Sequence, residues 1–168
     1  MKKLFLLLAT TFASFSLAQA QIGWTLNQCR QHFGKEVSQS NAGFAGESPF
    51  TDKNPNFKTF LVNYRELPPN PDLPARHYYT GYKVDIGFDP DGTVGEIYWH
   101  WSGELPEQEI MKLLRKASKV EWSRTNTEDE NGNWVGKQNG VVVFRADLSD
   151  SGTGFFFLEI TTVRNVKQ

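Results

Sequence analysis

The sequence predicts an α+β fold in which a single antiparallel sheet of about five strands carries two helices packed on one face. Three observations predict it. Several segments alternate apolar and polar residues, two short segments repeat apolar residues at helical spacing, and turn residues join neighbouring strand segments directly. The expected order is helix, strand, hairpin, helix, hairpin, which suits antiparallel neighbours. We find no internal repeat and expect one domain over residues 21–168.

The first twenty residues have the three-part layout of a secretory signal peptide. Lys2 and Lys3 precede an apolar run at 4–9, and Ala18 and Ala20 form a small-x-small cleavage pattern. Removing these residues takes away two of the 18 Lys and Arg residues and leaves 148 residues with a formal charge of −3. We therefore expect an exported protein, periplasmic or extracellular, for which nucleic acid is not an expected partner.

The rest of the chain predicts neither a membrane span nor a lipid anchor. No second run approaches the ~20 apolar residues that a bilayer crossing requires, so we expect the mature protein to be soluble. Cys29 follows Leu26-Asn27-Gln28 rather than the small apolar residues that precede a lipidated cysteine. As the single cysteine it is a buried thiol, a reactive thiol or half of an intermolecular bridge, in a monomer or weak dimer. Its helical spacing with Leu26 and Phe33 favours burial.

The first elements follow from capping and alternation. Thr25 and Gln28 have capping-box spacing and Gly34 follows as a stop, which predicts a helix over 25–33. Residues 35–57 are rich in Ser, Asn, Gly and Pro, and are a functional loop, a mobile loop or the place of a missed strand. Residues 58–64 alternate and predict a strand with Phe60, Val62 and Tyr64 on one side. The prolines at 68–74 then indicate a stiff connector or a polyproline ligand segment.

The clearest hairpin spans residues 78–101. Alternation on both sides of the turn sequence DPDG at 89–92 predicts two paired strands. Their core face is expected to carry Val84, Ile86, Phe88, Ile97, Trp99 and Trp101. Asp85, Glu96, Tyr98 and His100 are expected on the opposite face.

The remaining elements are a second helix and a second hairpin. Pro106 suits the first position of a helix whose apolar stripe is Ile110, Leu113, Leu114 and Ala117. The polar segment 123–133 is expected to be a loop. Residues 140–148 and 154–163 predict two strands joined through SDSG at 149–152.

No metal or cofactor site is expected. Asp89 and Asp91 fit a turn better than calcium, because glycine comes fourth in the segment whereas an EF-hand loop needs it sixth. The segment from Asp129 has Trp134 at that sixth position. The three histidines show no local zinc spacing.

Two groups of residues are candidates for function. Asp85, Glu96 and His100, with Tyr98 beside them, would form the acid-base site of a small hydrolase if they met across the first hairpin. The alternative is a solvated face with cross-strand charge pairs. No G-x-S-x-G motif supports a serine hydrolase.

The run of three phenylalanines at 155–157 defines the second group. Phe156 can face the core only if Phe155 and Phe157 face away from it. Those two rings are either covered by the loop at 35–57 or form an exposed patch for a partner, which Tyr98 and Trp134 would extend.

Two motifs resemble a known group of proteins. GWTLNQCRQHFG at 23–34 is similar to the opening helix motif G-[MW]-T-x-x-x-[VC]-x-x-x-[FYL]-G, and FDPDGTV at 88–94 is similar to a later hairpin motif, in small bacterial envelope proteins. These are related to the outer-membrane assembly factor SmpA/OmlA and to the β-lactamase-inhibitor-protein fold. The resemblance implies an α+β module whose sheet contacts other proteins, and it does not imply catalysis. The chain departs from the group in lacking a lipidation motif, tandem repeats and a disulfide pair.

These observations together predict an exported, non-enzymatic protein-binding module of the bacterial cell envelope. Its partner would be another envelope or secreted protein, held through Phe155 and Phe157. The alternative function is a small secreted hydrolase with its acid-base site around His100.

Overall fold

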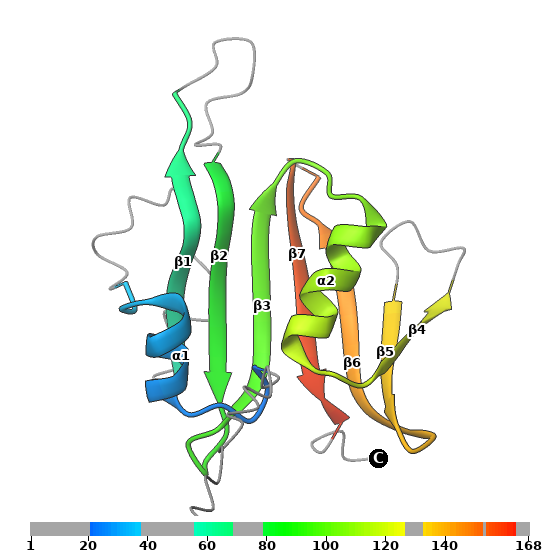
Figure 1. Ribbon diagram of the computed structural model, residues 1–168. Coiled ribbons are helices and arrows are strands. Elements are labelled where there is room, and N and C mark those ends of the chain that lie inside the picture. The colour runs from blue at the N-terminus through cyan, green and yellow to red at the C-terminus, as the bar shows by residue number, and fades with distance from the viewer. Residues whose placement is uncertain (1–20, 38–55, 69–78, 127–132, 153, 164–168) are drawn as a thin grey trace, which may run out of the picture.

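A computed structural model describes residues 21–37, 56–68, 79–126, 133–152 and 154–163. They form one seven-stranded antiparallel sheet with two helices on one side of it (Figure 1). The α+β class and the single antiparallel sheet are therefore confirmed. The expected signal peptide, most of the loop at 35–57 and most of the proline-rich connector lie outside the described residues. Neither described helix is long and apolar enough to span a membrane.

The sheet has the strand order β1-β2-β3-β7-β6-β5-β4, and every neighbouring pair is antiparallel. The strands are β1 (Phe57–Glu66), β2 (Tyr79–Phe88), β3 (Val94–Ser102), β4 (Glu121–Asn126), β5 (Asn133–Gln138), β6 (Val141–Asp150) and β7 (Phe155–Thr162). Because β3 and β7 pair with each other, the first and second hairpins join into a continuous sheet.

The prediction of about five strands was wrong, because β4 and β5 add a hairpin at one edge. The segment predicted as a loop supplies most of β4, whose only large apolar side chain is Trp122. Such a polar edge strand lacks the apolar alternation by which a half-buried strand is recognised. The turn between β5 and β6 consists of Asn139 and Gly140, with φ of 52° and 79°. Positive φ at both positions is typical of a tight Asn-Gly hairpin turn.

The first helix, α1 (Leu26–Phe33), begins at the predicted capping box. The Thr25 side chain accepts from the backbone N–H of Gln28, and the Gln28 side chain accepts from that of Thr25. Gly34 ends the helix with φ of 90°, a backbone conformation that favours glycine. Cys29 is fully buried against the sheet, which confirms the interpretation of this residue as a buried thiol.

The second helix, α2 (Glu107–Ala117), packs its predicted apolar stripe against the sheet. Pro106 precedes it as the N-cap, and Glu107 and Glu109 lie in its first turn, where the positive end of the helix dipole favours acidic groups. All four residues of the stripe are buried, namely Ile110, Leu113, Leu114 and Ala117.

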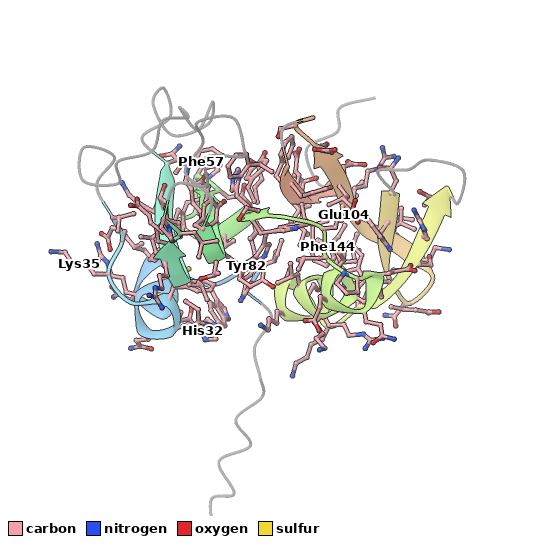
Figure 2. All side chains as sticks on the ribbon, turned by 90° about the horizontal axis from the view of Figure 1, so that it is seen from above. His32, Lys35, Phe57, Tyr82, Glu104 and Phe144 are labelled. Atoms are coloured by element: carbon pink, nitrogen blue, oxygen red, sulfur yellow. The ribbon has the colours of Figure 1, made fainter. Side chains whose placement is uncertain are left out.

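The hydrophobic core lies between the sheet and the two helices. Trp99 pairs with Val84 on one side and Leu158 on the other, and all three are buried in this layer. Viewed from above, both helices lie on the same side of the sheet, with Tyr82 between them (Figure 2). The predicted alternation of Phe60, Val62 and Tyr64 is interrupted after Val62, where the register with β2 shifts and Asn63 has φ of 51°; Tyr64 contacts the ring of Tyr79.

Candidate functional site

The predicted site residues lie mainly on the sheet face turned away from the helices, which we call the second face. Tyr98 pairs with Asp85 on β2 and with Glu159 on β7. His100 pairs with Lys83 and with Phe157. Residues at paired positions share a face, so the predicted division of the first hairpin is confirmed. Phe57, labelled in Figure 2, lies on this side.

Asp85 is the centre of a buried ionic cluster on the second face. Its side chain is 0% exposed, and the Thr59 hydroxyl donates to its Oδ1 at 2.6 Å. His100 Nε2 lies 3.0 Å and Lys83 Nζ 3.5 Å from Oδ2. Burial acts to raise the pKa of Asp85, but the contacts with His100, Lys83 and Thr59 outweigh it and lower the pKa to about 2. Asp85 is therefore a carboxylate at neutral pH, balanced by neighbouring basic groups.

This cluster places a carboxylate against an imidazole whose side chain is 18% exposed. A carboxylate in that position orients a histidine, as it does in acyl-transfer sites. The Thr59 hydroxyl is engaged by Asp85, and Phe157 lies beside the imidazole with ring centroids 6.1 Å apart. Asp85 is thus ion-paired with Lys83 and accepts from Thr59, and the described contacts of His100 include no hydroxyl or thiol nucleophile.

Glu96 does not join Asp85 and His100, so the predicted group of three is divided by the structure. Glu96 lies four residues before His100 on β3, which separates their backbone positions by about 13 Å. It lies instead near Tyr98, whose Oη is 3.5 Å from Glu96 Oε2 and 3.1 Å from Glu159 Oε1. Two carboxylates thus share one phenol, and of the two only Glu96 was expected beside Tyr98 from the sequence.

Both carboxyl groups of this acid pair hold their protons more tightly than usual. Burial raises the pKa of Glu96, and the charge of Glu159 raises it further, against the hydrogen bond with Tyr98. Burial and the charge of Asp147 raise the pKa of Glu159, against the same phenol. Since like charges and partial burial destabilise the ionised pair, a cation from outside would be favoured here.

Phe155 and Phe157 are half-buried on the second face, as their alternation with the buried Leu158 predicted. Phe155 stacks on Tyr79 with ring centroids 6.0 Å apart and an interplanar angle of 25°. Phe157 lies beside His100. On β7 the second face therefore presents two aromatic rings followed by Glu159.

Two residues expected to extend this patch do not do so. Tyr98 shares the face but is only 5% exposed, with the Phe57 ring 5.9 Å away. Trp134 pairs with Ala146 and is buried in the core on the helix side of the sheet, where Arg124 lies over its ring. The one-dimensional pattern did not fix the register of β5, and that register decides the face on which Trp134 lies.

One feature was missed by the sequence analysis, a pocket at the end of the sheet that we call the rim pocket. It has a volume of about 720 Å³ and lies where β2 begins, β3 ends and β7 begins. Its walls include Tyr79, Tyr82, Trp101 and Leu105. The signal in the sequence is a pair of glycines, Gly81 and Gly103, next to these aromatic residues.

The fold and these surfaces define an α+β protein with a helix-covered core face and a second face of mixed aromatic and ionic character. Comparisons with protein-family models, with curated proteins and with solved structures found no match to this chain. The resemblance to the SmpA/OmlA group stays an expectation from two sequence motifs.

Proposed function

We propose that the protein is an exported, non-enzymatic protein-binding module that holds another envelope or secreted protein against β7. The observation that carries the proposal is the row formed by Phe155, Phe157 and Glu159. These half-buried residues lie on the sheet face that neither α1 nor α2 covers. Aromatic residues near a charged rim are typical of protein interfaces.

The row suggests the chemistry of the partner. Alternate side chains on a strand are about 7 Å apart, so two apolar groups and one basic group at that spacing would match it. A lysine or arginine of the partner would offset the repulsion between Glu159 and Glu96. We therefore propose a partner surface with two apolar side chains beside one basic side chain.

The test is affinity capture by tagged mature protein, residues 21–168, from envelope and culture fractions of the producing cell. The wild type is expected to retain one partner in near-equal amount. Phe155→Ser with Phe157→Ser should abolish capture because it removes the apolar contacts. Glu159→Lys should also abolish it, because it places a cation against the partner's cation without removing either ring.

The matched control is Val141→Ser, which changes a 64% exposed apolar residue on β6. Capture should be unchanged in this variant. Equal loss of the partner in Val141→Ser would show that exposed apolar surface in general is responsible, and would overturn the proposal. Loss of the native circular dichroism spectrum in the double variant, together with full capture by Glu159→Lys, would show that the rings are structural.

The contact of His100 with Asp85 favours one second candidate, a small hydrolase acting on an envelope polymer. A histidine oriented by a buried carboxylate could activate a water molecule. This function requires that purified protein release products from such a polymer and that His100→Ala stop the release while the native circular dichroism spectrum is kept. An inactive wild-type protein would exclude it for the polymers tested.

A further inference from the structure

The residues that follow the expected signal-peptide cleavage point are built into the fold. The N–H of Gly23 donates to the carbonyl oxygen of Val94 at 2.8 Å, and the N–H of Val94 donates to that of Trp24 at 2.8 Å. Figure 1 shows this start of the described chain beside the end of α2 that leads into β4. A chain segment near a terminus is usually poorly ordered unless it is tied down, so these hydrogen bonds give residues 21–24 a structural role.

Gln21 and Ile22 bind the C-terminal end of α2. The N–H of Gln21 donates to the carbonyl oxygen of Lys116 at 3.2 Å, and the N–H of Ile22 donates to that of Ala117 at 3.0 Å. Both carbonyl groups belong to the last turn of the helix, where no further turn supplies donors and the helix dipole concentrates partial negative charge. A cation is therefore more favourable at this position than a neutral amide N–H.

Gln21 also carries an acceptor without a donor. The residue is 2% exposed, and its Oε1 is buried with no hydrogen-bond partner among the described residues. A peptide N–H has one hydrogen, and that of Gln21 is directed to Lys116. A buried acceptor without a donor costs free energy, which a further donor on the same residue would recover.

Cleavage of the signal peptide supplies both the further donor and the charge. Hydrolysis of the peptide bond between Ala20 and Gln21 adds the hydroxyl of a water molecule to the carbonyl carbon of Ala20 and the remaining hydrogen to the nitrogen of Gln21. The acid proton then moves to the amine, whose ordinary pKa is about 8, so the products at pH 7 are a carboxylate and an α-ammonium. The ammonium has three N–H donors where the peptide had one.

We propose that the α-ammonium of Gln21, formed when a signal peptidase cleaves after Ala20, is a structural cation bound at the C-terminal end of α2. It donates to the carbonyl oxygen of Lys116 and to its own Oε1. The basic side chains of the last turn, Arg115 and Lys116, are exposed, so solvent screens their repulsion of the ammonium. The proposal rests on the cleavage expected for an exported protein and is independent of the proposed partner contact on β7.

The first test measures the reactivity of the amine in the mature chain, residues 21–168, with a succinimidyl ester at pH 7. The bound ammonium reacts only when the segment opens, so the acylation rate of residue 21 should be lower in native than in urea-unfolded protein by about tenfold or more. Lys112 is the internal control, since its side chain is 61% exposed and its rate should change little on folding. Equal rates at residue 21 in the two states would overturn the proposal.

The second test isolates the charge. A chain that begins at Gln19 keeps the peptide N–H of Gln21 but moves the ammonium away from α2. Its equilibrium constant for urea unfolding at pH 7 should be about fivefold larger than that of the chain that begins at Gln21. Equal unfolding constants would show that a neutral N–H serves this position as well as an ammonium, and would overturn the proposal.

The third test concerns Oε1. Gln21→Met keeps the length of the side chain and removes the acceptor, so beginning the chain at Gln19 should then raise the unfolding constant only about twofold. Gln138→Met is the matched control, because Gln138 is an exposed residue of β5, and it should leave the fivefold difference unchanged. A fivefold difference that persists in Gln21→Met would refute the contact between the ammonium and Oε1.

The fourth test concerns the exported protein itself, purified from the producing cell. Mass spectrometry should find Gln21 as the first residue with an unmodified amine. A different first residue would overturn the proposal, as would the loss of one ammonia, which marks cyclisation of Gln21 to a neutral lactam. Capture of a partner enters none of these tests, so failure of this proposal is distinguishable from failure of the proposed function.

Discussion

Replacing Asp85 by Asn should destabilise the protein through the two basic groups that it leaves behind. Asparagine keeps the shape of the side chain and an oxygen for the Thr59 hydroxyl. It removes the negative charge that faces Lys83 and His100, whose side chains are only 11% and 18% exposed. The variant therefore isolates the electrostatic part of the cluster from its packing.

The expected magnitude follows from the burial of the cluster. Removing one member of a buried ion pair costs about 3–5 kcal/mol, and the partial exposure of Lys83 and His100 indicates the lower end, about 3 kcal/mol. The part that depends on pH is smaller. A pKa lowered from 3.8 to about 2 corresponds to roughly 2 kcal/mol.

The sign of the pH dependence follows from the direction of the shift. Folding lowers the pKa of Asp85, so between pH 2 and 4 the unfolded state binds more protons than the folded state. The free energy of unfolding therefore rises with pH in that window. The contribution of Asp85 is complete above about pH 4 and is lost as the pH falls towards 2.

Urea unfolding followed by tryptophan fluorescence at pH 7, 4, 3 and 2 measures this contribution. The difference between wild type and Asp85→Asn should shrink by roughly 2 kcal/mol between pH 4 and pH 2. Glu36→Gln is the control. Its ion pair with Arg30 also lowers the pKa of Glu36, to about 2. That pair lies at the surface, so removing it should change the free energy of unfolding negligibly. A difference that stays constant with pH would refute the assignment of the stabilisation to the charge of Asp85.

Three further predictions concern other sites. Burial raises the pKa of Cys29 to about 11, so the native protein should not react with a disulfide reagent and should run as a monomer on a non-reducing gel; rapid labelling would contradict this. Folding raises the pKa of Glu159, so its ionisation costs stability as pH rises, and Glu159→Gln should have a higher melting temperature at pH 7 with less gain at pH 4. Gly140→Ala, at φ of 79°, should cost about 1 kcal/mol in urea unfolding, and an unchanged midpoint would exclude strain in that turn.

The fold could be predicted where local patterns and tertiary contacts favour the same structure. Thr25, Gln28 and Gly34 determine both ends of α1 through hydrogen bonds between near neighbours. The turn at 89–92 and the alternation around it determine the first hairpin in the same way, with Asp91 accepting from the N–H of Thr93. Such signals require no knowledge of distant residues.

The edge hairpin could not be predicted from apolar alternation, because a strand at the edge of a sheet is largely exposed to solvent and carries mostly polar side chains. β4 exposes Ser123 and Arg124, and only Trp122 reaches the core. The turn chemistry of Asn139 and Gly140 was the usable signal, because adjacent Asn and Gly between extended segments are typical of a two-residue turn.

The candidate site was only half predictable for a different reason. The alternation of side chains along a strand assigns residues to a face of the sheet. It does not tell which strands become neighbours, nor which residues of the same face come into contact. Asp85 and His100 met as expected, whereas Glu96 shares the Tyr98 hydroxyl with Glu159, a residue 63 positions away from Glu96. That contact depends on the pairing of β3 with β7, which joins the two hairpins, and no short-range pattern specifies it.

The position of β7 explains why binding and stability can be separated on one strand. It pairs with β3 on one side and β6 on the other, so its backbone is held at the centre of the sheet. Leu158 and Ile160 are buried in the core, whereas Phe157 and Glu159 alternate with them on the second face. A surface on a strand held from both sides loses little conformational entropy when a partner binds. Substitutions at Phe157 and Glu159 should therefore change capture of the partner more than the free energy of unfolding, whereas substitutions at Leu158 and Ile160 should do the reverse.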